Sequence, residues 1–335
     1  MKTKLFQLRK LVTCLGMTLA TTYVVAQDTN YAKHTLTAPF IEEMTTEFGF
    51  LPEPLQAVFA NAERKQAILD AISRPAERVK LWKEYRPIFI TQARVDRGVE
   101  FWEKNAEALQ RAEDEYGVPA EVIVSIIGVE TIYGGNTGSY RVIDALSTLA
   151  FDYPPRAPFF RQQLKEFLLL TREEQVDPLS LKGSYAGAMG LPQFMPGSFR
   201  AYAVDFDHDG HIDIWHNPTD AVGSVANYFI EHGWQPGEAV AVRADIKQAS
   251  SADKGLSDSL DPKITVQELQ KLGWTPRTPL DENRKVTAFR LDAEQGPEYW
   301  IGLENFHAIT RYNRSVMYAM AVYELADLLA AARKE

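Results

Sequence analysis

Hydrophobic residues recur every three to four positions through most of the chain, which is the spacing of helices that pack one face on a core. Residues 40–111 show this pattern clearly and are rich in Ala, Glu, Leu and Arg. Four prolines are predicted to divide the stretch into separate helices: Pro52, Pro54, Pro75 and Pro87. The first third of the chain is therefore predicted to be helical.

Residues 118–232 are also predicted to be mainly helical, but long loops rich in Gly, Pro and Asp interrupt them. These loops span residues 133–140, 153–158, 182–196 and 205–220. Long loops inside a compact region carry function more often than short connections do. A functional site is therefore expected in this part of the chain.

The pattern changes at Gly233, after which alternating and β-branched residues predict short strands. The predicted strands are residues 239–242, 285–291 and 298–303. Residues 265–268 read Thr-Val-Gln-Glu, a capping box that predicts the start of a short helix. From Asn305 the helical spacing returns. The whole chain is thus predicted to be mainly α, of the α+β class, with a small α+β insertion at residues 234–302.

Composition limits the size of the core and the kinds of partner. The 335 residues exceed what one core usually serves, so two or three lobes are expected. The 36 Lys and Arg against 45 Asp and Glu give a formal charge of −9, which argues against general binding of nucleic acid. Cys14 is the single cysteine, so the chain has no internal disulfide and no cysteine-built zinc site.

Residues 1–26 have the features of a secretory signal. Four basic residues precede an apolar stretch, and Ala26 is a suitable cleavage position. Removal of this segment takes away four positive and no negative charges, which changes the net charge from −9 to −13. The alternative is an amphipathic first helix of the mature fold. No later stretch reaches the roughly 18 to 20 apolar residues of a membrane span.

Cys14 has a second interpretation, as the lipid-modified first residue of a lipoprotein. Residues 11–14, Leu-Val-Thr-Cys, loosely resemble a lipobox. Thr13 is bulky for the position before the cysteine, and only three residues separate Lys10 from Cys14. Secretion without a lipid anchor is therefore the first expectation, and lipidation the second.

Glu130 is the candidate for acid–base chemistry. Pro119 suits the first turn of a helix, and residues 120–131 form a strongly apolar run. Ile123 and Ile126 precede Glu130 by seven and four positions, so a helix places all three on one face. Desolvation there raises the pKa of a carboxyl group toward the value of a general acid near neutral pH. On this pattern alone, a helix-end glutamate that pairs with an arginine or faces solvent remains the alternative.

Residues 183–196 form a loop dense in small residues, with a hydroxyl, an amide and aromatic rings among them. Small residues allow a ligand to approach the backbone closely, and the polar and aromatic groups suit an extended polar polymer. A packed turn without a ligand would use many of the same residues. The composition therefore favours a binding cleft without establishing one.

Residues 205–213 follow the calcium-loop pattern D-x-D-x-D-G. Its oxygen ligands and turn glycine would be Asp205, Asp207, Asp209 and Gly210, with the backbone carbonyl of His211 at the seventh position. His216 stands at the twelfth position, where a glutamate is usual. The alternative is a solvated acidic turn without a metal ion.

Several blocks taken together resemble a known family. They are VSIIGVET at 124–131, YG at 133–134, ALSTL at 145–149, KGSYAGAMG at 182–190, QFMP at 193–196 and GSVANYF at 223–229. In this order they resemble the membrane-bound lytic murein transglycosylase B family, glycoside hydrolase family 103. The resemblance extends from about residue 40 to the end of the chain and is densest between residues 118 and 236.

The resemblance implies a goose-lysozyme-like catalytic core, an all-helical domain built from both ends of the chain and a small β-containing domain. The expected ranges are 1–26 for the signal, 27–111 for the N-terminal helical domain, 112–233 for the core, 234–302 for the insertion and 303–335 for the returning segment. Glu130 matches the catalytic acid/base of the family. The matching saccharide-binding residues are Ser184, Gln193, Tyr228, Tyr312, Asn313 and Tyr318.

The family reaction needs one carboxylate, whereas most glycosidases need two. The resemblance implies that Glu130 protonates the oxygen between N-acetylmuramic acid and N-acetylglucosamine, with assistance from the N-acetyl group. The ionised Glu130 then removes the proton of the C6 hydroxyl, which closes onto C1 and leaves a 1,6-anhydromuramoyl end. The rival interpretations are a lysozyme-type hydrolase and a noncatalytic peptidoglycan-binding protein.

The resemblance also adds Asp220 to the metal site, as a late aspartate that closes the loop after Asp205, Asp207, Asp209 and His211. One structural Ca²⁺ and no catalytic cofactor are expected. Peptidoglycan glycan strands are the expected partner of a periplasmic monomer, and proteins of cell-wall synthesis or turnover are further candidates.

Overall fold

The structure is a computed structural model that describes residues 30–73, 80–247 and 249–334. The predicted signal segment, Cys14 and Pro75 lie outside the described residues. Within these residues, no single helix is both long and apolar enough to cross a bilayer. Only the last two helices, taken together across a bend of 110°, meet the criteria of length and composition.

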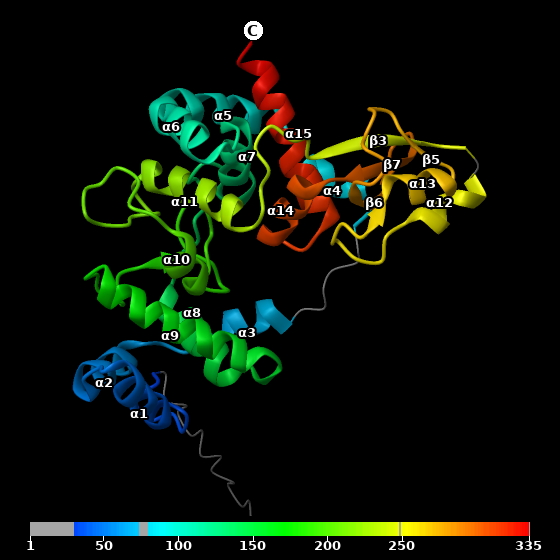
Figure 1. The fold of residues 1–335 in the computed structure, drawn as a ribbon. Helices are drawn as coiled ribbons and strands as arrows, with labels where there is room; N and C mark the ends of the chain where they lie inside the picture. The colour runs from blue at the N-terminus through cyan, green and yellow to red at the C-terminus, as the bar shows by residue number, and fades with distance from the viewer. Residues whose placement is uncertain (1–29, 74–79, 248, 335) are drawn as a thin grey trace, which may run out of the picture.

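Helices make up most of the chain, as the periodicity predicts (Figure 1). They are α1 (Thr37–Phe48), α2 (Pro52–Asn61), α3 (Gln66–Ser73), α4 (Trp82–Phe89), α5 (Gln92–Lys104), α6 (Ala106–Tyr116), α7 (Ala120–Thr131), α8 (Val142–Asp152), α9 (Ala157–Glu173), α10 (Pro196–Tyr202), α11 (Pro218–Glu231), α12 (Ala249–Gly255), α13 (Val266–Lys271), α14 (Glu304–Tyr312) and α15 (Val316–Ala332). The strands are β1 (Tyr140–Arg141), β2 (Lys182–Gly183), β3 (Ala241–Ile246), β4 (Ile264–Thr265), β5 (Trp274–Pro276), β6 (Lys285–Ala293) and β7 (Gly296–Gly302).

The predicted breaks at prolines are mostly the starts of helices. Pro52 opens α2, where its missing N–H costs nothing. Pro87, predicted to break a helix, lies inside α4, which ends two residues later at Phe89. The predicted loop at 153–158 is a short 3₁₀ turn, Pro154–Arg156, followed directly by α9.

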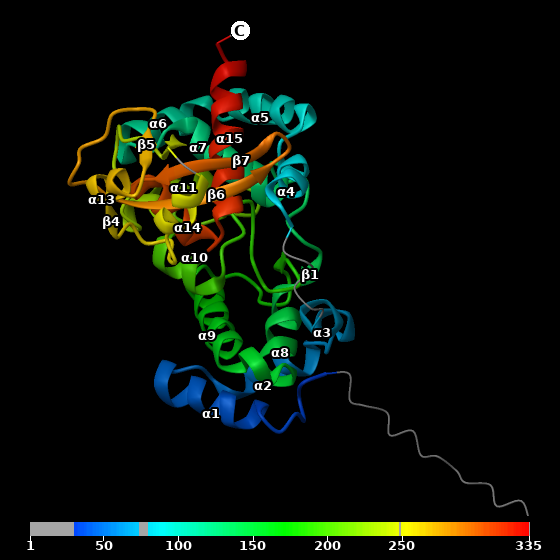
Figure 2. The ribbon, with the colours of Figure 1, turned by 90° about the vertical axis from the view of Figure 1, so that its right-hand side faces the viewer.

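Buried side chains gather into three hydrophobic clusters. Two are built mainly from helices and are here called the lower core and the upper core, and the third lies between α13 and the larger sheet. The lower core is built from α1–α3 and α8–α10. The upper core is built from α4–α7, α11, α14 and α15, with one face of the larger sheet. In both views, α1–α3, α8 and α9 lie toward the bottom of the molecule and α5–α7 and α15 toward the top (Figures 1 and 2).

Residues 27–111, expected as one helical domain, contribute to both cores. Helices α1–α3 pack on α8 and α9, whereas α4–α6 pack on α7, α11 and α15. The two groups separate between α3 and α4. The domain boundaries derived from the sequence stay a prediction.

The insertion contains a five-stranded antiparallel sheet in the order β4-β6-β7-β3-β5. Strands β6 and β7 form a long hairpin close to the predicted positions, and β3 begins two residues later than predicted. Strands β4 and β5 were not predicted, because two and three residues are too few to show an alternating pattern. The predicted capping box is confirmed, since the Thr265 side chain accepts a hydrogen bond from the backbone N–H of Glu268 at the start of α13.

Candidate active site

Glu130 is the next-to-last residue of α7, and its side chain is only partly exposed. The helix is buried almost all round, from Val122 to Val129. The sequence predicts one apolar face that contains Ile123 and Ile126. In the structure both residues are buried, and so are the other sides of this part of the helix. Glu130 lies where this buried helix ends.

Burial and one hydrogen bond determine the acidity of Glu130. Its Oε1 accepts a hydrogen bond of 2.6 Å from the hydroxyl of Tyr318, which α15 carries. Desolvation raises the pKa of the Glu130 carboxyl from 4.5 to about 7, and the Tyr318 hydrogen bond opposes part of that rise because it stabilises the ionised form. A carboxyl group with such a pKa can give up a proton and take one back near neutral pH.

Two further tyrosines lie close enough to Glu130 for its charge to raise their pKa. The pKa of Tyr312 is raised well above its ordinary value, first by burial and then by the charge of Glu130. The pKa of Tyr85 is also raised by burial and by the charge of Glu130. Tyr85 was not proposed from the sequence, and no local pattern marks it, because α4 and the end of α7 meet only in the folded chain.

The chain reverses sharply after Glu130. Ile132 and Tyr133 adopt left-handed φ values of 54° and 58°, which place the loop after α7 across the end of the helix. The Tyr133 ring folds back between two glycines: a Cβ at Gly98 or Gly128 would lie 2.4 or 2.5 Å from its hydroxyl. The absence of a side chain at both positions therefore lets Tyr133 pack beside α7.

Thr131 connects the end of α7 to the glycine-rich loop. Its hydroxyl donates a hydrogen bond to the carbonyl of Leu191 at 3.0 Å and accepts one from the backbone N–H of Gly134 at 3.1 Å. Leu191 packs in the upper core, whereas Met189 packs in the lower core. The loop thus bridges the two cores directly beside Glu130.

Ser184 and Gln193 are held by hydrogen bonds to backbone groups of this loop and, for Gln193, also to Thr137. The Ser184 hydroxyl accepts a hydrogen bond from the backbone N–H of Ala188 at 3.0 Å. Gln193 has a left-handed φ of 53°, and its amide donates hydrogen bonds to the carbonyls of Thr137 at 3.1 Å and Gly190 at 3.0 Å. A strained, non-glycine residue fixed in this way is typical of functional loops.

Aromatic side chains pack beneath the loop. The Tyr312 hydroxyl donates a hydrogen bond to the carbonyl of Pro192 at 2.7 Å, so α14 supports the loop directly. The Tyr228 ring lies 4.7 Å from that of Tyr312, and its hydroxyl donates to the carbonyl of Arg311 at 2.7 Å. Asn313 is exposed immediately after α14. Of the proposed residues, Tyr318 contacts Glu130 directly, and Tyr312 contacts the loop that carries Gln193.

The acidic loop forms a cluster of oxygens. Ligand atoms of Asp205, Asp207 and Asp209 lie within 4.8 Å of one another. Asp205 also accepts hydrogen bonds from the backbone N–H groups of Asp209 at 3.1 Å and Gly210 at 2.9 Å, which curl the loop around the cluster. An all-oxygen donor set of this kind fits Ca²⁺.

Asp220 closes the acidic loop through the backbone. Its side chain is fully buried, and its two oxygens accept hydrogen bonds of 2.8 Å from the backbone N–H groups of Phe206 and Asp213. These contacts join both ends of the loop to the first turn of α11. His211 is exposed next to the loop glycine.

Comparison with known proteins identifies close relatives. The family described as "Transglycosylase SLT domain" matches residues 32–327. The chain is 45% identical over 313 residues to the membrane-bound lytic murein transglycosylase B of Escherichia coli (strain K12), which covers 91% of this chain and 85% of that protein.

Solved structures agree with the sequence match. The catenated lytic transglycosylase SltB1 from Pseudomonas aeruginosa superposes with a TM-score of 0.89 at 64% identity, covering 91% of this chain and all of that one. The Escherichia coli lytic transglycosylase Slt35 in complex with calcium superposes with a TM-score of 0.84 at 46% identity, covering 91% of this chain and 96% of that one. The mainly α fold with a small sheet is thus the fold of the solved lytic transglycosylases.

Proposed function

The chain belongs to the transglycosylase SLT family, and on that premise we propose that it is a lytic transglycosylase that cleaves peptidoglycan. The bond cleaved is the β-1,4 linkage between N-acetylmuramic acid and N-acetylglucosamine. The product is a 1,6-anhydromuramoyl end, and no water is consumed. The family and the close relatives support this activity over a lysozyme-type hydrolase or a noncatalytic peptidoglycan-binding protein.

The observation that carries the mechanism is the carboxyl group of Glu130 at the end of a buried helix, where it accepts a hydrogen bond from Tyr318 and where burial raises its pKa to about 7. Protonated Glu130 donates its proton to the bridging oxygen as the bond from that oxygen to C1 breaks. The N-acetyl group assists at the positively charged C1. Glu130, now ionised and stabilised by the Tyr318 hydroxyl, takes the proton of the C6 hydroxyl as that oxygen bonds to C1. Glu130 ends protonated, ready for another cycle.

Mass spectrometry of digested cell-wall sacculi tests both substrate and reaction. We expect fragments that end in anhydromuramic acid; fragments that carry an added water would indicate a lysozyme-type hydrolase. Glu130→Gln is expected to fold and to bind glycan but not to cleave it. Glu121→Gln is the matched control, because Glu121 lies in the first turn of the same helix and its pKa is also raised by burial.

A structural calcium site in the acidic loop is part of the proposal. The ligands are the side chains of Asp205, Asp207, Asp209 and Asp220 with the backbone carbonyl of His211. A relative's structure in complex with calcium and the all-oxygen cluster of this chain support it. The ion would neutralise converging carboxylates and so hold the loop against α6 and α11. No catalytic cofactor is part of the proposed reaction.

The residues proposed to bind the glycan strand near Glu130 are Ser184, Gln193, Tyr228, Tyr312, Asn313 and Tyr318. Their support is the order of the motifs and their gathering around one loop and the helices beneath it. The periplasm is the proposed location, since murein lies there, with lipid anchoring through Cys14 as the alternative. A monomeric enzyme with partners in the cell-wall machinery completes the proposal.

A further inference from the structure

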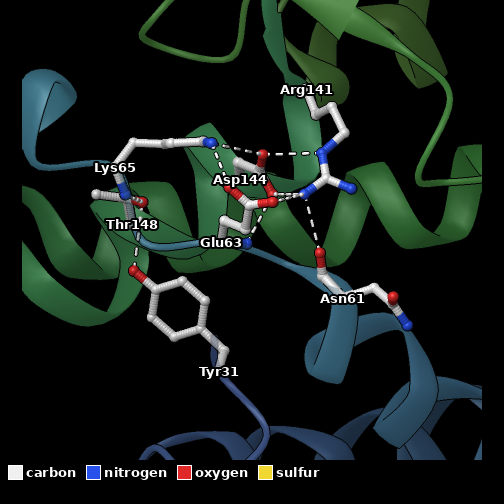
Figure 3. Close-up of polar contacts among 7 residues, drawn as sticks. All are labelled: Tyr31, Asn61, Glu63, Lys65, Arg141, Asp144 and Thr148. Carbon is white, nitrogen blue, oxygen red and sulfur yellow. Dashed lines mark hydrogen bonds and ion pairs between the residues drawn. The ribbon is translucent and has the colours of Figure 1, made fainter. Parts of the chain in front are cut away.

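We propose that Arg141, held by the carboxylate of Asp144, is a positioning residue that fixes Ser184 and Gln193 for glycan binding. This inference rests on the proposed function. It starts from a polar network between α8 and the segment that joins α2 to α3 (Figure 3). That network lies in the lower core, apart from Glu130.

Asp144 is the centre of the network. Its carboxylate is 1% exposed, and it accepts two hydrogen bonds of 2.9 Å from the Arg141 guanidinium, one on each oxygen. Oδ1 also accepts a hydrogen bond of 2.8 Å from the backbone N–H of Glu63. The Arg141 guanidinium donates further to the carbonyl of Asn61 at 2.9 Å. A buried carboxylate needs such partners, so the arginine is held in one orientation.

Arg141 belongs to β1, which pairs with β2, the strand that leads into the glycine-rich loop. In the β1–β2 pair, Arg141 lies opposite Lys182 and Tyr140 opposite Gly183. Ser184 follows β2 directly, so its position depends on where β1 lies. Holding the Arg141 side chain therefore holds β1, and through the β1–β2 pairing it also positions Ser184.

The residues just before β1 reach Gln193. The carbonyl of Thr137 accepts the hydrogen bond from the Gln193 amide. Gly138 touches the β2 backbone so closely that a Cβ would lie 2.1 Å from the carbonyl oxygen of Gly183. One short segment, residues 137–141, thus contacts both polar residues of the loop and is anchored at its end by Arg141.

Glu130 is held independently of this anchor. Its hydrogen-bond partner Tyr318 and its helix α7 belong to the upper core, whereas Asp144 lies at the start of α8 in the lower core. Loss of the Arg141 anchor should therefore change glycan binding without changing the acidity of Glu130. A general loss of stability would not separate these two effects.

The variant that tests this is Arg141→Lys, which keeps the charge but cannot make the planar pair with Asp144. Tyr31→Phe is the matched control. Tyr31 lies before α1, and its hydroxyl donates hydrogen bonds to Thr148 at 3.3 Å (Figure 3) and to Asp152 at 2.7 Å. Both partners lie on α8 and neither on β1.

Binding is measured by calorimetry with soluble, peptide-free glycan strands, using proteins that also carry Glu130→Gln so that no cleavage occurs. Arg141→Lys is expected to weaken binding roughly fivefold to tenfold, the loss of about one hydrogen bond, and Tyr31→Phe to leave it unchanged. In the active enzyme, Arg141→Lys should raise KM, with kcat and the pH midpoint of kcat unchanged.

Unchanged binding in Arg141→Lys, or equal weakening in both variants, would overturn the inference. If Arg141→Lys fails to fold by circular dichroism, Arg141→Gln is measured under the same criteria. A wild-type protein that leaves glycan strands uncut contradicts the proposed function instead. Glycan that fails to bind even the Glu130→Gln protein overturns both.

Discussion

Tyr318→Phe should move the pH dependence of the reaction, because it removes the only hydroxyl that we find hydrogen-bonded to Glu130 among the described residues. The change deletes one oxygen from a buried side chain and keeps the ring that packs in the upper core. The hydrogen bond stabilises the ionised carboxylate, so its loss favours the protonated form and raises the pKa of Glu130.

The size of the change follows from the hydrogen bond. A hydrogen bond to a charged group contributes about 1.5 to 3 kcal/mol, and one pKa unit corresponds to about 1.4 kcal/mol, so the pKa should rise by about one to two. From a starting value of about 7, the pKa of Glu130 should reach about 8 to 9. The first step needs protonated Glu130, so the rate falls as pH rises through this value. The basic limb of the kcat profile should therefore move to higher pH.

The assay is kcat for release of anhydromuramoyl products, measured from about pH 5 to about pH 10. The plateau rate of Tyr318→Phe should also fall, because the carboxylate loses the contact that orients it. Tyr323→Phe is the control, since Tyr323 lies on the same helix and its pKa is raised by burial and Asp327 rather than by Glu130. A basic limb of Tyr318→Phe at or below the wild-type pH would refute the assigned role of the hydrogen bond.

Three further predictions concern stability. Burial raises the pKa of Glu130 from 4.5 to about 7, so ionisation of Glu130 above pH 7 costs the folded protein stability. Glu130→Gln should therefore raise the free energy of unfolding by up to about 3 kcal/mol above pH 7 and leave it unchanged below pH 4.5. Urea unfolding in both pH ranges checks this, and an equal gain in both would contradict it. Phe40→Ala should cost about 3 to 5 kcal/mol, because Phe40 is 0% exposed and packs edge-on against Phe59, whereas Phe159→Ala, at a 40% exposed site, should cost far less in the same assay. Calcium at a hundredfold excess over its Kd should add about 2.7 kcal/mol to the free energy of unfolding, and Asp207→Asn should reduce that gain. Thermal melts with and without chelator measure both effects, and a Tm that chelator leaves unchanged would contradict the calcium site.

Local features of the sequence predicted local structure well. The capping box at Thr265 needs only four consecutive residues, and α13 begins there. The β6–β7 hairpin also follows from two adjacent segments of alternating residues. Strands β4 and β5 were missed because their short pairing is decided by the neighbouring strand rather than by their own pattern.

The division of the helices between two cores could not be read from their spacing. Helices α3 and α4 have similar apolar periodicity, yet α3 packs on α8 and α4 packs near α15. Periodicity states that a helix has a buried face, but it does not name the partner of that face. Tyr85 was missed as a neighbour of Glu130 for the same reason.

The order of the residues alone predicts which groups carry the chemistry: one glutamate at the end of an apolar helix, a glycine-rich loop and an acidic turn. How that glutamate behaves depends on the folded chain. Its pKa depends on burial and on a hydroxyl from Tyr318, 188 residues away along the chain. The anchoring of the loop likewise depends on Arg141, Asp144 and the backbone near residue 61. Desolvation and hydrogen bonding depend on which groups are close in space. Only the folded chain brings these distant residues together.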